Sequence, residues 1–359
     1  MSTTKRNKIT HLTIGRTLRA IRLETASLVA TILLDQGADI LELTHKQTGT
    51  DVLWKVPYPV REPGVGPTPA GDSYAQWMHF YRGGWQAIFP NFGPAVRYRN
   101  AMLDFHGEAA RRPWHLESEI CGADVAVEVS TELSCLPLAI KRRLTLSGAR
   151  PELAIAETVS NRSDEAVDCM WVHHPVFGAP LLSPQSRIYT GARLIHTDDS
   201  YDVPANDLPL GKLFEWPLVT ARRGGQVDLS RIPAPGSGLS RLVFLEDFEQ
   251  PWCAMVNPDI PLGVALRWNG ELMRYMCLWQ ETGGHRDFPH FAKTYATALE
   301  PATSLFGHGL LDAIENTHTQ LTLPAGESRT LQLKAILFSD RRPLRAVTSD
   351  GELEFRSGQ

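Results

Sequence analysis

Apolar residues recur at every second position along much of this chain, and this pattern constrains its fold more than any other feature. Residues 125–133, 138–146 and 153–159 each place Val, Leu or Ile side chains on one face of an extended segment. A period of two is typical of a half-buried β-strand, whereas a helix has a period near 3.6. Turn residues separate these runs. The sequence therefore predicts an all-β fold, an antiparallel β-sandwich with few short helices.

The 359 residues show no composition shift or linker that would divide them, so we expect a single domain over residues 1–359. We expect residues 1–8 to be flexible. The Pro-rich stretch 55–75 is too long for a hairpin and is predicted to be a functional or mobile loop. Residues 291–301, FAKTYATALEP, are rich in alanine, but their alternation and the proline near their end favour a strand.

Charge and cysteine content exclude several classes of protein. A net charge of −4 without a block of basic residues argues against a nucleic-acid partner, and the basic run IKRRLTL (140–146) is predicted to be the solvated face of a strand. The five cysteines are scattered and include no C-x-x-C pair, which indicates reduced, mostly buried thiols. Neither a signal peptide nor a long apolar span is apparent, so we expect a cytoplasmic protein with no membrane partner.

Two adjacent histidines, His173 and His174, lie in the stretch WVHHPVFGAP. Neighbouring side chains on a strand point to opposite faces, so only one of the pair can enter a given site. The other is then expected to have a structural hydrogen bond or a packing role.

Aromatic, amide and acidic residues gather beside glycine turns in three further stretches. YRGGWQAIFPNFGP contains Trp85 and Asn91, LDFHGEAARRPW contains His106 and Glu108, and the stretch from LWQETGGHRDFPHF to TALEP follows near the end. Aromatic rings stack on the C–H face of a sugar, while amides and carboxylates bind its hydroxyls. A His and a Glu facing each other across such a cleft would form a general acid/base couple.

The order of these pieces resembles the aldose 1-epimerase (galactose mutarotase-like) superfamily, and more closely its branch of uncharacterised, DUF4432-type proteins. The resemblance rests on GGWQAIFPNFGP, FHGEAARRPW, SNRSDEAVDCMWVHHPVFG, ALEP and LPAGESRTLQL, the last of which is similar to the family's terminal hairpin. It extends roughly over residues 10–340 and implies a β-supersandwich with a sugar site on a concave face.

The resemblance also implies roles. His174, three residues before Phe177, falls on the family's acid histidine, and Glu300 falls on its catalytic base. Glu300 would take the proton of the anomeric hydroxyl while His174, on the opposite side of the acetal, protonates the ring oxygen. His106 falls on the substrate-orienting histidine. The implied activity is the interconversion of α and β anomers of an aldose or modified sugar, with no cofactor.

This chain departs from the family pattern where His106-Gly107-Glu108 replaces the usual HGG, which brings a carboxylate near the site. No clear counterpart of the family's sugar-binding aspartate is present, and Asp287 or Glu281 would have to replace it. An acidic group on the sugar would require an arginine. The full set of expected substrate-binding residues is His106, Glu108, Asn91, Trp279, Gln280, Arg82 and Asp287, and the other arginines considered are Arg111, Arg112 and Arg286.

Two alternatives stay open. His106, Glu108 and His174, with His173 or His290, could bind a metal ion in a sugar isomerase, although neither H-x-H nor H-E-x-x-H is present. A non-catalytic sugar-binding protein on the same fold would keep the aromatic residues without needing an acid/base pair. In each case the expected partner is a small sugar, and the chain is expected to be a monomer or homodimer.

Overall fold

A computed structural model describes residues 7–61 and 71–356. Within these residues the chain divides into two compact units, which are described separately here. Unit 1 takes in the stretch ending at Asp51, Pro59–His173 and Thr303–Leu333, and unit 2 takes in Val52–Tyr58, His174–Ala302 and the C-terminal stretch from Lys334. The boundary between the units falls inside one strand, between the two adjacent histidines. The predicted single domain stays a prediction.

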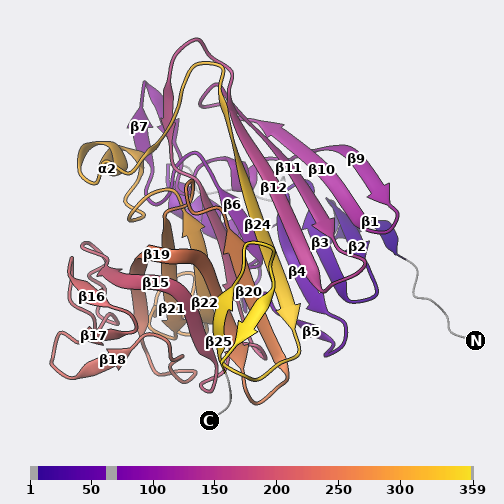
Figure 1. Cartoon of the computed structure of the whole chain (residues 1–359). Helices are drawn as coiled ribbons and strands as arrows, with labels where there is room; N and C mark the ends of the chain where they lie inside the picture. Colours follow the sequence, from indigo (N-terminus) through magenta and orange to yellow (C-terminus); the bar gives the residue numbers. More distant parts are fainter. Residues whose placement is uncertain (1–6, 62–70, 357–359) are drawn as a thin grey trace, which may run out of the picture. The chain divides into compact units, whose positions relative to one another are not determined.

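Unit 1 consists mainly of antiparallel strands, as the alternation predicted, with a few short helical segments. The strands β9–β12 lie side by side, as Figure 1 shows, and β1–β4 form a second antiparallel run. Its elements are β1 (Lys8–Ile14), β2 (Leu18–Glu24), β3 (Leu28–Leu33), β4 (Asp39–His45), β5 (Thr50–Asp51), α1 (Ser73–Phe80), β6 (Trp85–Ile88), β7 (Val96–Tyr98), β8 (Ala101–Leu103), η1 (Ala109–Arg111), β9 (His115–Cys121), β10 (Val125–Glu132), β11 (Leu138–Leu146), β12 (Glu152–Asn161), β13 (Val167–Cys169), α2 (Leu310–Glu315) and β23 (Leu321–Leu323). Strands β14 (Val172–Phe177) and β24 (Ser328–Phe338) pass from one unit into the other.

The core of unit 1 forms where the alternating apolar faces of these two runs meet. Strand β2 contacts β10, and β3 contacts β11. Ile21 and Ile32 are fully buried on one side, as are Leu144 and Ile155 on the other. Removing such side chains from water contributes roughly 1.5–3 kcal/mol each, which is why the period-two pattern determines which face points inward.

The basic run 140–146 corrects one prediction. Lys141 and Arg143 are exposed, but Arg142 between them is 2% exposed. Arg142 occupies an inward position of β11 and lies directly opposite Glu157 on β12, with which it forms a buried ion pair. The run is therefore not simply a solvated face, because its central arginine enters the core.

Unit 2 is built around β19, an 18-residue strand whose first half pairs with β21 and whose second half pairs with β20. Strand β15 pairs along β19, and β21 pairs with β22, so that these strands lie side by side in Figure 1. The elements are β15 (Arg187–Thr197), β16 (Leu213–Glu215), β17 (Leu218–Thr220), β18 (Gln226–Asp228), β19 (Ser240–Asn257), β20 (Leu262–Trp268), β21 (Tyr275–Thr282), β22 (Tyr295–Ala302), β25 (Leu344–Val347) and β26 (Leu353–Phe355).

Several local predictions can be compared with these elements. The alanine-rich segment 291–301 contributes the strand β22, as predicted. The predicted terminal hairpin is wrong, because β23 pairs with β13 whereas β24 pairs with β12, so the Pro-Ala-Gly-Glu turn joins strands with different partners. Most of the terminus predicted to be flexible (residues 1–6) and the centre of the Pro-rich loop (62–70) lie outside the described residues, and the end of that loop begins α1.

All five cysteines are free, in line with the prediction of reduced thiols; three are buried, Cys135 is half-buried and Cys121 is exposed. Among the described residues, no helix has the length and apolar character needed to cross a membrane.

Candidate active site

The two adjacent histidines of β14 have separate partners, as strand alternation predicted. His173 lies in unit 1, where the indole Nε1 of Trp85 donates a hydrogen bond of 3.1 Å to its Nδ1. Its Nε2 lies 3.5 Å from Oε1 of Glu157, which also accepts a hydrogen bond of 2.7 Å from Nε1 of Trp171. Because an indole N–H only donates, Nδ1 of His173 is an acceptor, and the ring proton is placed on Nε2. His173 is therefore a buried structural residue.

Glu157 is charged although it is fully buried. Burial alone would raise the pKa of its carboxyl group, but the charge of Arg142 and its hydrogen bond, with a contribution from the neighbouring His173, lower that pKa to about 2. Arg142 is held in turn by a hydrogen bond of 3.0 Å to the carbonyl oxygen of Ala38 and by the face of the Trp114 ring. This network fixes the core of unit 1 around His173.

His174 belongs to unit 2 and meets Glu300. Its Nδ1 lies 2.7 Å from Oε2 of Glu300, and the residues are 6% and 2% exposed. The ring N–H direction does not satisfy hydrogen-bond geometry, so the contact is a close approach that becomes an ion pair when the imidazole is protonated. The two residues expected to supply the acid and the base thus lie in direct contact, and a sugar ring does not fit between them in this arrangement. Beside them, burial and the charge of Glu300 raise the pKa of the Cys277 thiol.

The strand register explains how Glu300 is placed. Residues directly opposite each other on neighbouring strands point to the same side of a sheet. Three rows of such residues run across β19, β21 and β22, and together we call them the carboxylate face. The rows are Phe244, Cys277 and Glu300; Leu242, Trp279 and Ala298; and Ser240, Glu281 and Ala296.

The middle row of the carboxylate face is the part open to solvent. Leu242 and Trp279 are partly exposed, whereas the residues of the two outer rows are buried. Small Ala298 stands opposite Trp279, so the indole has no bulky neighbour on β22. Trp279 therefore presents a partly exposed ring face beside the His174–Glu300 contact, and such a face can pack against apolar C–H groups.

In the outer row that contains Ser240 and Ala296, Glu281 is fully buried and binds the start of the Gly-Gly-His loop that follows β21. Its Oε1 accepts backbone hydrogen bonds from Gly283 at 2.9 Å and Gly284 at 2.6 Å, and its Oε2 lies 2.6 Å from Nδ1 of His285. Burial would raise the pKa of Glu281, but the hydrogen bonds from His285 and Ser240 outweigh burial and lower it. Glu281 is therefore a carboxylate that orients His285.

A family comparison covers the part of the chain that contains His174. The model for a domain of unknown function, DUF4432, matches residues 15–208, more than half of the chain. The chain belongs to the DUF4432 family. A comparison with curated proteins gave no match.

Solved structures similar to this DUF4432 protein share its fold. A Klebsiella pneumoniae protein provisionally described as an aldose 1-epimerase has a TM-score of 0.70 at 16% identity, over 94% of this chain and 88% of that one. A galactose mutarotase-like protein from Clostridium acetobutylicum has a TM-score of 0.64 at 18% identity, over 93% and 99%. One from Lactobacillus casei has a TM-score of 0.59 at 19% identity, over 89% and 99%. These structures confirm the predicted fold class, and the DUF4432 match confirms the resemblance to that branch.

The histidine expected to orient the substrate, His106, lies in unit 1 of the DUF4432 protein within an aromatic cluster. Its ring is 4.9 Å from that of Trp77 and 5.4 Å from that of Phe92, and its Nδ1 accepts a hydrogen bond of 3.1 Å from the backbone N–H of Gly93. The backbone at His106 and Gly107 has positive φ values of 58° and 70°. Gly107 is required there, because a Cβ atom would collide with the carbonyl oxygen of Phe89.

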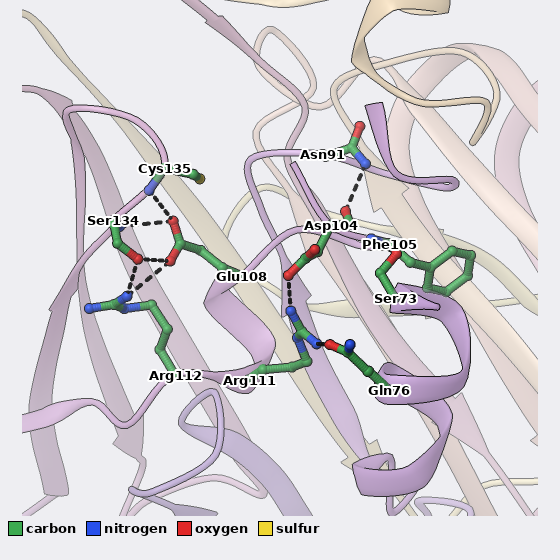
Figure 2. Close-up of polar contacts among 10 residues, drawn as sticks. All are labelled: Ser73, Gln76, Asn91, Asp104, Phe105, Glu108, Arg111, Arg112, Ser134 and Cys135. Atoms are coloured by element: carbon green, nitrogen blue, oxygen red, sulfur yellow. Dashed lines mark hydrogen bonds and ion pairs between the residues drawn. The ribbon is translucent and has the colours of Figure 1, made fainter. Parts of the chain in front are cut away.

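Glu108, the residue that departs from the family pattern, binds its own surroundings (Figure 2). One carboxylate oxygen accepts backbone hydrogen bonds of 2.8 Å from Ser134 and Cys135, and the other accepts from the Ser134 hydroxyl at 2.6 Å and from Arg112 at 2.9 Å. Glu108 therefore binds an arginine of its own stretch, AARRPW. With both oxygens of Glu108 and Nδ1 of His106 engaged by protein donors, this pair gives no support to the metal-site alternative.

The other predicted substrate-binding residues have varied surroundings. Asn91 is buried and donates to the carbonyl oxygens of Pro94 and Asp104 at 2.8 and 3.0 Å, the second of which Figure 2 shows. Gln280 points away from the carboxylate face and donates to the carbonyl oxygen of Arg231 at 3.0 Å. Asp287 is exposed in the loop after β21. Of the residues predicted to bind substrate, only Trp279 shares a sheet face with Glu300.

The arginines considered for an acidic substituent are mostly engaged elsewhere. Arg82 donates to Gln36 and to the carbonyl oxygen of Arg61, at 3.4 and 3.0 Å, and Arg111 pairs with Asp104. Arg112 binds Glu108, and Arg286 is exposed.

Sequence reasoning missed two features of the carboxylate face. The first is the link from Tyr201 through Ser240 to His285, with 2.6 Å between the two hydroxyl oxygens and 3.2 Å from Ser240 Oγ to His285 Nδ1. The second is that Glu281 shares a face with Glu300. Alternation could have detected it, because Glu281 lies four residues after Cys277 on β21 and therefore points to the same side, and Cys277 stands opposite Glu300.

Proposed function

We propose that this protein is an aldose 1-epimerase that interconverts the anomers of a sugar by general acid/base catalysis. The observation that carries the proposal is the contact between His174 and Glu300, buried beside a partly exposed tryptophan on one face of unit 2. The fold shared with galactose mutarotase-like proteins supports the same reaction class, although fold alone does not establish an activity.

The contact suggests how the acid and base act together. The anomeric hydroxyl and the ring oxygen are bonded to the same carbon, so one pair of adjacent side chains can serve both from one side. In the proposed reaction, Glu300 takes the hydroxyl proton while His174 gives a proton from Nε2 to the ring oxygen, and the bond between C1 and the ring oxygen breaks.

The open-chain aldehyde then rotates about its C1–C2 bond. The freed hydroxyl attacks the other face of the carbonyl, returns its proton to His174, and the new anomeric oxygen recovers a proton from Glu300. Protons and electrons balance without a further reactant, and both side chains return to their starting states.

Anomer exchange measured by NMR on a panel of aldoses tests the proposal. We expect at least one aldose to equilibrate faster with the protein than without it. Glu300→Gln and His174→Ala should each lower that rate by about 10²–10⁴-fold, the usual contribution of a positioned acid or base.

A matched control is Glu119→Gln, which makes the same chemical change in an exposed His–Glu pair, where Nε2 of His11 lies 2.6 Å from Glu119. This variant should keep the full rate, and circular dichroism should show that all variants are folded. If no aldose in the panel is accelerated, or if Glu300→Gln keeps the rate of the unmodified protein, the proposal is wrong.

A further inference from the structure

The carboxylate face holds a second histidine–carboxylate pair that the proposed reaction does not use. His174 and Glu300 lie at one outer row, and Glu281 and His285 lie at the other. Successive rows are two residues apart on β21, so the row of Glu300 and the row of Glu281 each lie about 7 Å along the strand from Trp279. A sugar stacked on Trp279 would therefore have one pair at each end.

The second pair, Glu281 and His285, presents polar atoms that can bind a sugar hydroxyl. His285 Nδ1 is held by Glu281, which leaves Nε2 as the ring atom available for a ligand, and the His285 side chain is 32% exposed. Nε2 lies 3.4 Å from the hydroxyl of Tyr201, which is near the limit for a hydrogen bond. A sugar hydroxyl can donate to this nitrogen when the imidazole is neutral and accept from it when the imidazole is protonated.

Neighbouring rings complete a wall around these atoms. The ring of His290 lies 5.2 Å from that of His285 and 6.1 Å from that of Trp279, and its Nδ1 is 2.8 Å from the hydroxyl of Thr294. Burial, with a smaller effect from the charge of His285, lowers the pKa of His290 to about 4, so His290 is neutral near pH 7. It adds no positive charge at this end of the face.

The balance of charge favours an uncharged ligand. The nine positions of the carboxylate face include two carboxylates, Glu281 and Glu300, and neither a lysine nor an arginine. The nearest arginine on these strands, Arg241, points to the opposite side and pairs with Asp207. Each carboxylate of this face is already paired with one histidine, and Arg286, next to His285, is exposed, so a phosphate or carboxylate on the sugar would meet a carboxylate at either end without a spare buried cation to bind it.

We propose that His285 binds a hydroxyl at the end of the sugar remote from the anomeric carbon, that Glu281 is its positioning residue, and that this pair selects neutral aldoses over sugar phosphates. The proposal rests on the proposed aldose 1-epimerase activity and names the substrate class of that site. It gives the second pair a role in recognition, while His174 and Glu300 carry out the chemistry.

Steady-state kinetics of anomer exchange with the best neutral aldose of the panel provide the first test. A hydrogen bond to a polar group is worth about 0.5–1.5 kcal/mol, so His285→Ala should raise KM by roughly 2–13-fold. Glu281→Gln should also raise KM, by more than it lowers kcat. Glu300→Gln should show the opposite split, a fall in kcat with a smaller change in KM, and the Glu119→Gln control should change neither constant.

Deoxy sugars test the proposed hydrogen bond between His285 and a sugar hydroxyl. The first of these measurements uses the unmodified protein, so it does not depend on a variant that folds. One deoxy analogue, among those lacking a hydroxyl remote from C1, should show a raised KM with the unmodified protein. With His285→Ala, that analogue and the parent sugar should have the same KM, because the partner of the missing hydroxyl is gone. The 6-phosphate of the parent sugar should be turned over at least 10-fold less efficiently, as kcat/KM.

The outcomes separate this inference from the proposed function. If no aldose is accelerated, the epimerase proposal fails, and with it this inference. If anomers exchange but the phosphate is the better substrate, or His285→Ala raises KM equally for the parent sugar and every deoxy analogue, only the recognition role of the second pair is refuted. Binding of the parent sugar to Glu300→Gln, followed by ligand-observed NMR, gives the same comparison without turnover.

Discussion

Replacing Glu157 by glutamine should destabilise the protein strongly, and the structure gives the size of the effect. The pKa of Glu157 falls from 4.5 to about 2 in the folded state. Each pKa unit corresponds to about 1.4 kcal/mol, so the ionised carboxylate contributes about 3 kcal/mol to folding at neutral pH. The variant also leaves Arg142 charged and buried, and breaking a buried ion pair typically costs about 3–5 kcal/mol. We therefore expect Glu157→Gln to lower the free energy of unfolding by at least about 3 kcal/mol.

The pH dependence of this effect has a definite sign. A lowered folded-state pKa means that the stabilisation is fully present above the unfolded-state value near 4.5 and is lost as the pH falls toward 2. The difference between the unmodified protein and Glu157→Gln should therefore be constant from about pH 6 to 8. Below pH 4.5 it should shrink by about 1.4 kcal/mol per pH unit.

Urea unfolding followed by tryptophan fluorescence measures both quantities. Glu165→Gln is the matched control, because Glu165 pairs with Arg99 at 3.4 Å on an exposed surface, where such pairs contribute less than about 1 kcal/mol. The double variant Arg142→Met, Glu157→Leu should be more stable than Glu157→Gln, since it leaves no unpaired buried charge. A cost below 1 kcal/mol for Glu157→Gln, or one that persists unchanged at pH 3, would refute the reasoning.

Three further predictions concern other parts of the described structure. Gly107→Ala should lower the free energy of unfolding by more than about 1 kcal/mol in chemical denaturation, because the residue has φ +70° and its Cβ would meet the carbonyl oxygen of Phe89. Asp39→Asn should keep or increase the free energy of unfolding at pH 7, because burial raises the pKa of Asp39 despite a hydrogen bond from Gln86. Any gain should disappear as the pH falls below about 3.8, the ordinary value for an aspartate, and a loss above about 1 kcal/mol in urea unfolding contradicts the reasoning. A thiol reagent should modify Cys121 first in the folded protein, and peptide mapping that finds a buried cysteine modified first would contradict the exposure pattern.

Much of the fold was predictable because alternation acts locally and one face of each strand is buried. The charged residues of the unit 1 core could also have been found in this way. Arg142 and Glu157 interrupt two apolar runs at inward positions, since Leu144 and Ile155 lie two residues away on the same faces. Two opposite charges at inward positions of consecutive strands predict a buried pair once the strands are aligned. The basic composition of IKRRLTL concealed this signal.

The terminal strands show where local patterns fail. The Pro-Ala-Gly-Glu turn has strong turn chemistry, and the flanking runs alternate, so a hairpin was the natural prediction. Pairing is decided by the whole sheet, and β12 and β13 supply the partners instead. The expectation that Trp279 and Gln280 both bind substrate meets a similar limit, because adjacent residues on one strand point to opposite faces.

The two adjacent histidines show why one short motif can serve both stability and chemistry. Because β14 alternates, His173 joins the Trp85 and Glu157 network, while His174 contacts Glu300. A strand anchored at one residue by a charged, fully buried network leaves little freedom to the next residue, and an acid/base pair benefits from such preorganisation. The proposed chemistry at His174 would thus depend on the stability of the network around His173, so that Glu157→Gln should slow anomer exchange as well as weaken folding.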